Sequence, residues 1–370
     1  MSLKEIFCQD KAIGILQHAL ASGRPAHAYI FAGHAGVGKF KTAAQWAKML
    51  LCENPVIEKN YSDSCSRCPS CLLFETNSHP DFEHVYKELV EFTEEGKGKK
   101  TPVDLPKAVI REFLIEKVSS RPTLSKRKVF VVSEAEKLNA ASQNSLLKTL
   151  EEPPAYCTII LLCTRMEMLL PTTKSRCQII SFSRIDENRI IEKLKELGLG
   201  EPQTRYFARL AQGSIGAACQ WAKLELADAN LYQIKKDLVA SLAGYKYADS
   251  LDIAEQILDD SRKIADIWAK LDNNTSRTDI NRQVQKTLIQ IIISALQDAM
   301  KLDFTETEKL TNFDQAEHLK NLAMRLTPEQ SAEKIIEAYR ADRFIDANVN
   351  EKLIFEQLLL NLGISDKIKV

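Results

Sequence analysis

The stretch that decides the fold of the first half of the chain is HAYIFAGHAGVGKFKTAAQWAKMLLC, residues 27–52. It opens with a short apolar run that ends in glycine, which predicts a buried β-strand over residues 27–33. A glycine-rich loop follows, and the apolar residues after it recur at helical spacing. A strand, a glycine-rich loop and a helix in this order form a framework that binds phosphate groups through backbone N–H groups and the helix N-terminus.

The loop fits the phosphate-binding pattern, Gly, four residues, Gly-Lys and then Ser or Thr, except at its last position. The residues that correspond to a nucleotide-binding loop are Gly33, Gly36, Gly38 and Lys39, and we interpret the loop as vestigial. Phe40 stands where the pattern requires a hydroxyl group that holds magnesium. Thr42 cannot replace that hydroxyl, because two residues along a helix turn the side chain by about 200°.

The second magnesium ligand in such proteins is an aspartate at the end of a β-strand. The apolar run KVFVV, residues 128–132, predicts such a strand, and SEAEKL follows it. Ser133 therefore takes the aspartate position, and Glu134 takes that of the carboxylate that activates water. One departure is compatible with a tolerated variant, but the loss of both magnesium ligands favours the loss of ATP hydrolysis. Binding of a nucleotide without hydrolysis stays open.

Strand-like and helix-like segments alternate in the first half of the chain. Further strands are predicted over residues 81–86, 157–164 and 178–182, and the continuous apolar runs indicate strands that are covered on both faces. The alternation predicts an α/β fold with a parallel sheet and helices on both faces. After about residue 184 every segment has helical spacing, including a long amphipathic helix over residues 279–300. Two helical domains are therefore expected to follow the α/β domain.

Nine cysteines occur, and three of them form the cluster CSRCPSC: Cys65, Cys68 and Cys71. Together with Cys52 upstream, they have the spacing of a closed four-thiolate zinc site, which is structural rather than catalytic. His79 and His84 are alternative ligands, although their place in a strand pattern favours ordinary structural histidines. The other cysteines lie mostly in apolar runs and are interpreted as small buried hydrophobic residues.

The overall composition excludes several classes of protein. Lysine plus arginine and aspartate plus glutamate each total 50 among 370 residues, which argues against a protein that grips nucleic acid by bulk charge. This balance, and the absence of aromatic residues between basic ones, also disfavours a stand-alone zinc-containing DNA-binding module. No apolar run is long enough to span a membrane, and the first residues contain no apolar signal core, so a cytoplasmic protein is expected.

Three motifs carry a resemblance to a known family: NSLLKTLEEPP (residues 144–154), TIILLCT (158–164) and KSRC (174–177). Together they resemble the AAA+ subunits of sliding-clamp loaders. The cysteine cluster after the loop helix and NSHPDF, residues 77–82, are similar to the bacterial branch of that family. The resemblance implies an AAA+ P-loop domain over residues 1–184 with a zinc module at about 52–71, a small helical lid domain over 185–243, and a C-terminal helical collar domain over 244–370.

The resemblance also implies roles for single residues. Arg176, in the SRC motif, would be an arginine finger that reaches the ATP site of a neighbouring subunit, where a planar guanidinium stabilises phosphate charge. From the sequence alone, the alternative is that Arg176 caps a helix or pairs with a surface carboxylate. Thr164 takes the place of the first sensor residue, and Gly216 stands where the second sensor arginine is expected. Lys148 and Glu152 are interpreted as shaping the interface rather than as catalytic.

The implied function is that of a non-hydrolysing subunit of the DNA polymerase III clamp loader. Its cofactors would be structural zinc and ATP bound at a partner's interface, and its partners would be gamma/tau-type motor subunits, the delta subunit, the sliding clamp and primed DNA. The alternative is an ATP-hydrolysing motor subunit of gamma/tau type, with magnesium held by Glu134 or by water alone. A small basic cluster comprises Arg121, Lys126, Arg127 and Lys128. It is interpreted either as a DNA phosphate contact or as a solvated loop.

Overall fold

The structure is a computed structural model, and it describes residue 3 and residues 6–58, 61–95, 104–272 and 275–363. The chain forms two compact units, residues 1–185 and 186–370. The first unit contains all the strands among the described residues, and the second is helical. The finer division of the second unit into a lid and a collar stays a prediction.

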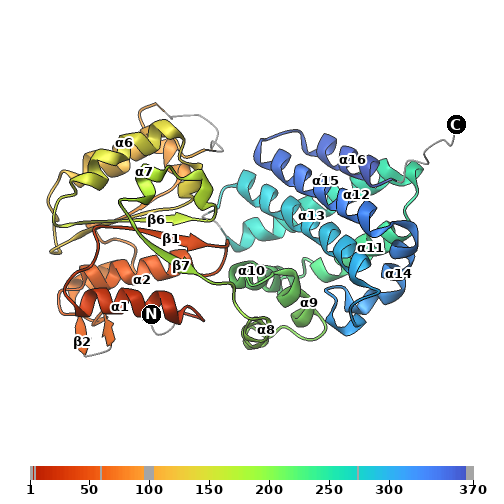
Figure 1. Cartoon of the computed structure of the whole chain (residues 1–370), viewed down its shortest axis with the longest axis horizontal. Coiled ribbons are helices and arrows are strands. Elements are labelled where there is room, and N and C mark those ends of the chain that lie inside the picture. Colours follow the sequence, from red (N-terminus) through yellow and green to blue (C-terminus); the bar gives the residue numbers. More distant parts are fainter. Residues whose placement is uncertain (1–2, 4–5, 59–60, 96–103, 273–274, 364–370) are drawn as a thin grey trace. The chain divides into compact units, whose positions relative to one another are not determined.

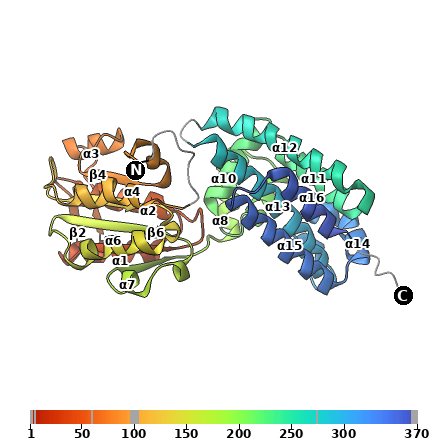
Figure 2. The same cartoon turned by 90° about the horizontal axis from the view of Figure 1, so that it is seen from above.

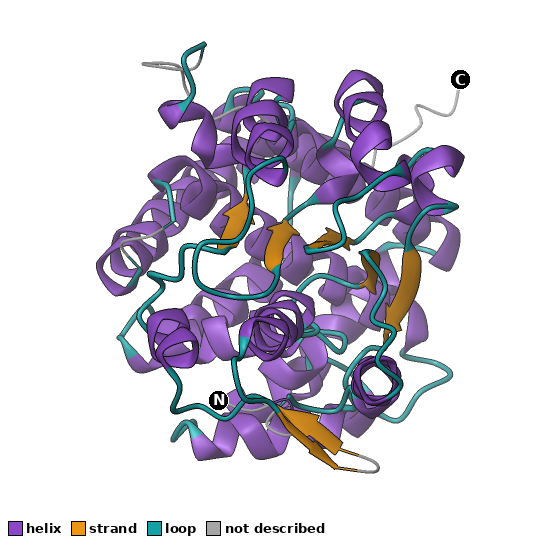
Figure 3. Ribbon diagram, turned by 90° about the vertical axis from the view of Figure 1, so that its left-hand side faces the viewer, coloured by secondary structure: helices purple, strands orange, loops and turns teal. Residues whose placement is uncertain are grey.

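The first unit is built on a five-stranded sheet in the order β4-β5-β6-β1-β7 (Figure 1, Figure 3). The strands are β1 (Ala28–Gly33), β4 (Phe82–Val85), β5 (Lys128–Val132), β6 (Cys157–Cys163) and β7 (Gln178–Phe182). Every neighbouring pair is parallel, so the predicted parallel α/β sheet is confirmed. Because all strands run in one direction, the loops after β1, β4, β5 and β6 meet at the same edge of the sheet, where ligands bind in this architecture.

Both faces of this sheet are covered by helices. On one face, α1 (Asp10–Ala21) and α2 (Lys39–Leu51) pack on alternate strand residues such as Phe31 and Val131. On the other face, α6 (Ala140–Glu151) and a helical run pack on the residues between them, such as Ile30 and Phe130. This run comprises α4 (Lys107–Ile110), η3 (Arg111–Ile115) and α5 (Glu116–Val118). Burial on both faces explains why the strands are continuous apolar runs.

A small module follows α2. It contains the two-stranded antiparallel hairpin of β2 (Val56–Glu58) and β3 (Tyr61–Asp63), and the short helix α3 (Pro69–Glu75). Lys48, on α2, is 1% exposed, and its Nζ donates to Glu75 Oε1 at 2.6 Å and to Ser66 Oγ at 3.0 Å. These contacts bind the module to the end of the helix that begins at the phosphate loop.

The second unit is formed by nine α-helices among the described residues. They are α8 (Glu187–Glu196), α9 (Gln203–Leu210), α10 (Ile215–Leu226), α11 (Leu231–Ala243), α12 (Ser250–Leu271), α13 (Arg277–Lys301), α14 (Ala316–Arg325), α15 (Pro328–Asp346) and α16 (Glu351–Leu362). Helix α13 lies among α11, α12, α14 and α15 (Figure 2). Residues on almost every side of α13 are buried, among them Ile280, Leu288, Ile291 and Ile292. The predicted helix is therefore present, but its description as amphipathic is wrong because neighbouring helices surround it.

Polar contacts connect the segment predicted as the lid to the segment predicted as the collar. Trp221 Nε1, on α10, donates to Thr287 Oγ1 at 3.2 Å, and Gln290 Nε2, on α13, donates to Leu210 O at 2.6 Å. The buried Lys235, on α11, forms an ion pair with Asp314. Both segments therefore belong to one compact unit.

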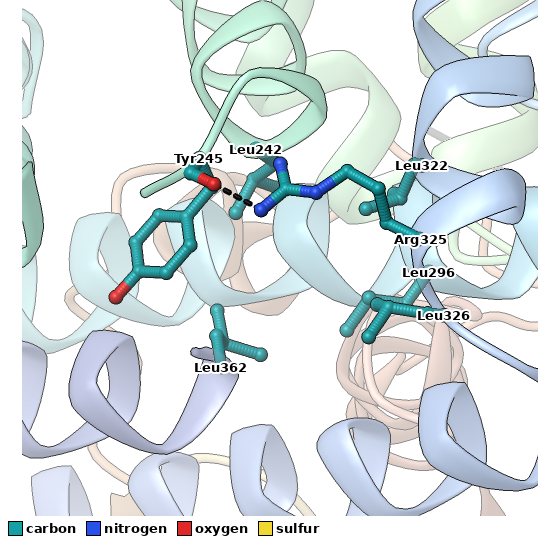
Figure 4. Close-up of a pocket in the computed structure, with 7 residues that line it drawn as sticks. All are labelled: Leu242, Tyr245, Leu296, Leu322, Arg325, Leu326 and Leu362. Atoms are coloured by element: carbon teal, nitrogen blue, oxygen red, sulfur yellow. Dashed lines mark hydrogen bonds between the residues drawn. The ribbon is translucent and has the colours of Figure 1, made fainter. Parts of the chain in front are cut away.

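The chain passes from α11 to α12 beside a small pocket that is lined by five leucines, Tyr245 and Arg325 (Figure 4). The Arg325 guanidinium donates to the carbonyl oxygen atoms of Ala243 and Tyr245, and so satisfies backbone groups after the end of α11. Tyr245 Oη in turn donates to Leu359 O, on α16, at 2.6 Å. No helix in the described part of the chain is both long and apolar enough to cross a membrane.

Candidate functional site

The phosphate-loop framework lies between β1 and α2, at the carboxyl edge of the sheet. Gly33 approaches β7 so closely that a Cβ atom there would lie 2.5 Å from Phe182 O, which excludes a side chain. Gly38 precedes α2 with φ 98°, a left-handed conformation that favours glycine. The Thr42 hydroxyl donates to Gly38 O at 3.0 Å and is fully buried. It is therefore not available to a ligand in the loop.

Lys39 is folded back onto its own loop. Its Nζ donates to Gly33 O and to His34 O, both at 2.6 Å, and the residue is 8% exposed. Burial lowers the pKa of Lys39, and the nearby Glu136 carboxylate opposes this shift. A phosphate group would have to replace these two carbonyl oxygens as the partner of the ammonium group.

The two positions that would supply magnesium ligands are linked to each other through His84. The Phe40 ring packs on the His84 ring with 4.5 Å between their centroids, and Phe40 is 44% exposed. His84, on β4, lies 2.8 Å from the Ser133 hydroxyl through Nε2, and its other neighbour is Tyr86, at 4.8 Å between ring centroids. The Phe40 ring therefore replaces the hydroxyl that would hold magnesium, and an uncharged Ser133 hydroxyl that contacts His84 replaces the carboxylate.

Burial lowers the pKa of His84 to about 4, so the ring is neutral at pH 7. A neutral ring packs between Phe40 and Tyr86 without a charge to compensate. The sequence suggested that His84 was an ordinary histidine, but the structure places it in direct contact with both altered positions. The pairing of β4 with β5 brings His84 beside Ser133, and Phe40 reaches His84 from the first turn of α2.

Lowering the pH from 7 to 4.5 is expected to destabilise the α/β unit partly through His84. The pKa is about 4 in the folded chain and about 6.5 in an unfolded one, so the unfolded chain binds more protons between these values. Stability therefore falls as the pH falls through this window, by at most about 3 kcal/mol from this group. Thermal unfolding of His84→Gln should show a smaller acid-induced decrease than wild type, with the exposed His18→Gln as the matched control. Equal decreases in wild type and His84→Gln would contradict this.

The two glutamates after β5 have different environments. Glu134 has φ 52° and forms ion pairs with Lys137, at 2.6 Å, and Lys87, at 3.8 Å. Glu136 is buried and accepts hydrogen bonds from Thr164 N, at 3.2 Å, and from the Thr164 hydroxyl. The residue at the predicted first-sensor position is thus held by Glu136, which sequence reasoning missed because it selected the glutamate directly after Ser133. The available signal was the second glutamate in SEAEKL.

Gly216 lies in the first turn of α10, where the Ser214 hydroxyl caps the helix by accepting from Ala217 N. It belongs to the second compact unit, whereas the phosphate loop belongs to the first. At this position the chain has no side chain that could contact a phosphate.

Arg176 follows α7 (Pro171–Lys174) and makes three polar contacts within its own unit. Its NH2 group lies 2.6 Å from Glu151 Oε1, and its NH1 group donates to Thr172 O at 2.9 Å and to Ser175 Oγ at 3.3 Å. An open hollow beside it is lined by His27, Leu150, Glu151, Ser175 and Arg176. In the free chain the guanidinium thus pairs with a surface carboxylate, yet it stays accessible, with 32% of its side chain exposed.

The four cysteines that the sequence singled out lie together in the module after α2. Their Sγ atoms all lie within 4.8 Å of one another, with 3.5 Å from Cys52 to Cys65 and 3.9 Å from Cys52 to Cys68. A tetrahedral zinc ion with bonds of about 2.3 Å separates its sulfur ligands by about 3.8 Å, so these spacings fit.

Backbone N–H groups support these sulfur atoms. Cys65 N donates to Cys52 Sγ at 3.3 Å, and Cys68 N donates to Cys65 Sγ at 3.4 Å. Burial acts to raise the pKa of the Cys65 thiol, but N–H donors from Arg67 and Cys68 and the neighbouring thiols outweigh it and lower the pKa to about 6. N–H donors stabilise thiolate ligands, so the chemistry of the donor set suits a metal ion.

His79 is excluded from this cluster by its own contacts. Its Nε2 lies 2.8 Å from Ser70 Oγ and 3.2 Å from Ser125 Oγ, and its Nδ1 accepts from Asp81 N. The Asp81 carboxylate accepts hydrogen bonds from the backbone N–H groups of residues 123–125 at 2.6–2.8 Å. These residues of the NSHPDF motif are therefore structural and hold the following loop.

The loop that Asp81 holds contains the predicted basic cluster. Arg121 and Lys126 are exposed, whereas Lys128 is buried and its Nζ donates to Lys117 O at 3.0 Å and Ser120 Oγ at 2.7 Å. Lys128 is thus a structural residue and is not presented to a ligand.

Comparison with known proteins identifies the family of this chain. A family described as DNA polymerase III, delta subunit, matches residues 8–186, and a second, described as its C-terminal part, matches residues 268–363. The delta' subunit of DNA polymerase III from Bacillus subtilis (strain 168) is 23% identical over 96% of both chains. The chain belongs to the delta-prime family of DNA polymerase III clamp-loader subunits. The delta' subunit from Escherichia coli (strain K12) is 32% identical over 60% of each chain.

The delta-prime family has relatives of another type in the same comparison. The tau/gamma subunit of DNA polymerase III from Haemophilus influenzae is 27% identical over 88% of this chain, and the match spans 44% of that protein. Among solved structures, a gamma subunit-related protein from Thermotoga maritima aligns with 93% of this chain at 16% identity and a TM-score of 0.47. The first family match covers almost all of the α/β unit, and the second lies within the helical unit.

Proposed function

We propose that this chain is a non-hydrolysing subunit of the DNA polymerase III clamp loader. In this role it provides Arg176 to the ATP site of a neighbouring gamma/tau-type subunit, within a complex that also contains a delta subunit. The complex loads the sliding clamp onto primed DNA in the cytoplasm.

The observation that carries this proposal is the contact of Phe40, His84 and Ser133. A subunit that hydrolyses ATP needs a hydroxyl at the place of Phe40 and a carboxylate at the place of Ser133 to hold magnesium, which neutralises the charge that develops on the phosphates. Here a neutral imidazole connects the two positions, with the Phe40 ring packed on it. Restoring a magnesium ligand at only one of the two positions would leave the His84 imidazole between them.

Arg176 supports the second half of the proposal. It keeps two N–H contacts to its own helix end, and its NH2 group pairs with the exposed Glu151 beside an open hollow. A charged, planar group at an accessible edge is suited to stabilising phosphate charge in a neighbouring subunit.

The C-terminal helices carry exposed apolar side chains that suit a role in assembly. On α15 and α16, Ile336 is 52% exposed, Tyr339 49% and Leu353 59%. Apolar side chains that gather on a surface mark protein–protein contacts. We assign them to packing against the corresponding helices of the other subunits.

Zinc is the metal that the four thiols fit best, since four thiolates in tetrahedral arrangement leave no open position for water. Cys52, Cys65, Cys68 and Cys71 would hold it, and the ion would stabilise the module without taking part in ATP chemistry. The motor-type alternative is favoured by Lys39 and the retained loop, but Phe40 offers magnesium no oxygen atom and the Ser133 hydroxyl contacts His84.

The purified chain is expected to hydrolyse Mg-ATP no faster than a reaction without protein, because both ligand positions are altered. Lys39→Ala should leave this background unchanged. Steady-state phosphate release checks both, with a gamma/tau-type subunit as the positive control. Turnover by the isolated chain that Lys39→Ala abolishes would contradict the proposal and establish the motor-type alternative.

A further inference from the structure

The ion pair between Arg176 and Glu151 occupies the part of the guanidinium that would face a phosphate group. The NH1 group donates to Thr172 O and Ser175 Oγ, which belong to the same chain segment as Arg176. The NH2 group lies 2.6 Å from Glu151 Oε1, on a different helix. Because a guanidinium offers its donors in fixed directions, Glu151 and a phosphate would compete for the same donor.

Glu151 has an electrostatic reason to keep this partner. It is the last residue of α6, and Glu152 and two prolines follow it. A carboxylate at the C-terminal end of a helix is disfavoured by the helix dipole, so a nearby cation stabilises it. The ion pair with Arg176 therefore gives Glu151, the first glutamate of the LEEPP stretch, a structural role.

The ion pair between Arg176 and Glu151 can break, and Arg176 can bind another anion, without unfolding of the chain. The Arg176 side chain is 32% exposed and that of Glu151 is 46% exposed, and both line the open hollow. An ion pair with this exposure contributes little to stability, so a multiply charged phosphate can displace it.

We propose that Glu151 is a positioning residue. In the free chain it holds Arg176 in an ion-paired conformation, here called the parked state, and it releases Arg176 when a neighbouring ATP site binds the guanidinium. This inference rests on the proposed role of Arg176. Parking keeps the guanidinium beside the interface and lowers the fraction of it that is available to the neighbour.

Removing the charge of Glu151 is expected to free Arg176. With phenylglyoxal, which modifies accessible guanidinium groups, Arg176 in the isolated Glu151→Gln chain should react about two- to fivefold faster, because the carboxylate no longer holds its NH2 group. Glu152→Gln is the matched control at the same helix end, and its labelling rate, followed by mass spectrometry, should equal wild type. An unchanged rate at Arg176 in Glu151→Gln would overturn the parked state, whatever Arg176 does in the complex.

In the reconstituted complex, Glu151→Gln should raise kcat for ATP about two- to fivefold with little change in KM, because more of the finger is available. Glu151→Asp, which restores the carboxylate, should return kcat toward wild type. The gain should shrink at high salt, which screens the pair, and disappear in an Arg176→Ala background.

Two outcomes separate the two hypotheses. Unchanged or lower kcat in Glu151→Gln, with a strong loss in Arg176→Ala, would overturn the positioning role and leave the arginine finger intact. Unchanged kcat in Arg176→Ala would overturn both the finger and the role of Glu151.

Discussion

Replacing Arg176 with alanine in a reconstituted clamp-loader complex is expected to lower ATP turnover at the neighbouring site by about a hundredfold or more. Arginine fingers contribute about 10³–10⁵ to catalysis in related phosphoryl transfer, because the guanidinium stabilises charge in the transition state. The total ATP turnover of the complex should therefore decrease by the fraction that this one site contributes. Steady-state phosphate release and single-turnover kinetics with limiting ATP measure the two quantities.

Two further variants make this result specific. Arg176→Lys keeps the charge but not the planar fork, so we expect it to recover only a small part of the activity. Arg262→Ala removes an exposed arginine on α12 that pairs with Asp259 and should match wild type. Assembly, measured by gel filtration, should be the same in all three variants. Full turnover in an assembled Arg176→Ala complex would remove the proposed role.

The second large effect is expected for the cysteine cluster. Cys71→Ser should abolish binding of one zinc ion per chain and lower the unfolding temperature of the α/β unit by on the order of 10 °C. Structural zinc contributes its binding free energy directly to folding, and Cys71 is fully buried. The loss also frees the end of α2, since Cys52 follows that helix directly.

Metal analysis and calorimetry check this prediction. Cys8→Ser, which lies outside the cluster, is the matched control and should keep its zinc and its unfolding temperature. Chelation of wild type should produce the same decrease as Cys71→Ser. A chain purified without zinc that unfolds at the same temperature as the zinc-bound protein would contradict a structural role for the metal.

The strands of the α/β unit could be predicted because burial on both faces leaves a direct mark on the sequence. Residues 128–132 form β5 as the apolar run indicated, and Gly33 ends β1 where close packing on Phe182 requires glycine. The four cysteines could be grouped from spacing because a closed thiolate site needs short intervals between ligands.

Other features depend on contacts between distant segments and left no local mark. The contact of His84 with Ser133 needs the pairing of β4 with β5, and its contact with Phe40 needs α2 to lie beside β4. Glu151 meets Arg176 only because α6 ends beside the segment after α7. Helix α13 has polar residues at regular spacing, yet helices surround it and bury them, Asp298 among them, which accepts from Asn312 N at 2.7 Å.

We propose that this chain lost its own ATP chemistry and contributes an arginine to that of a neighbour. The most direct test compares Lys39→Ala and Arg176→Ala side by side in the same reconstituted complex, with equal assembly and saturating Mg-ATP. We expect Lys39→Ala to retain ATP turnover within about twofold of wild type, whereas Arg176→Ala should lose the activity of one site. Loss of turnover in Lys39→Ala together with wild-type turnover in Arg176→Ala would contradict it.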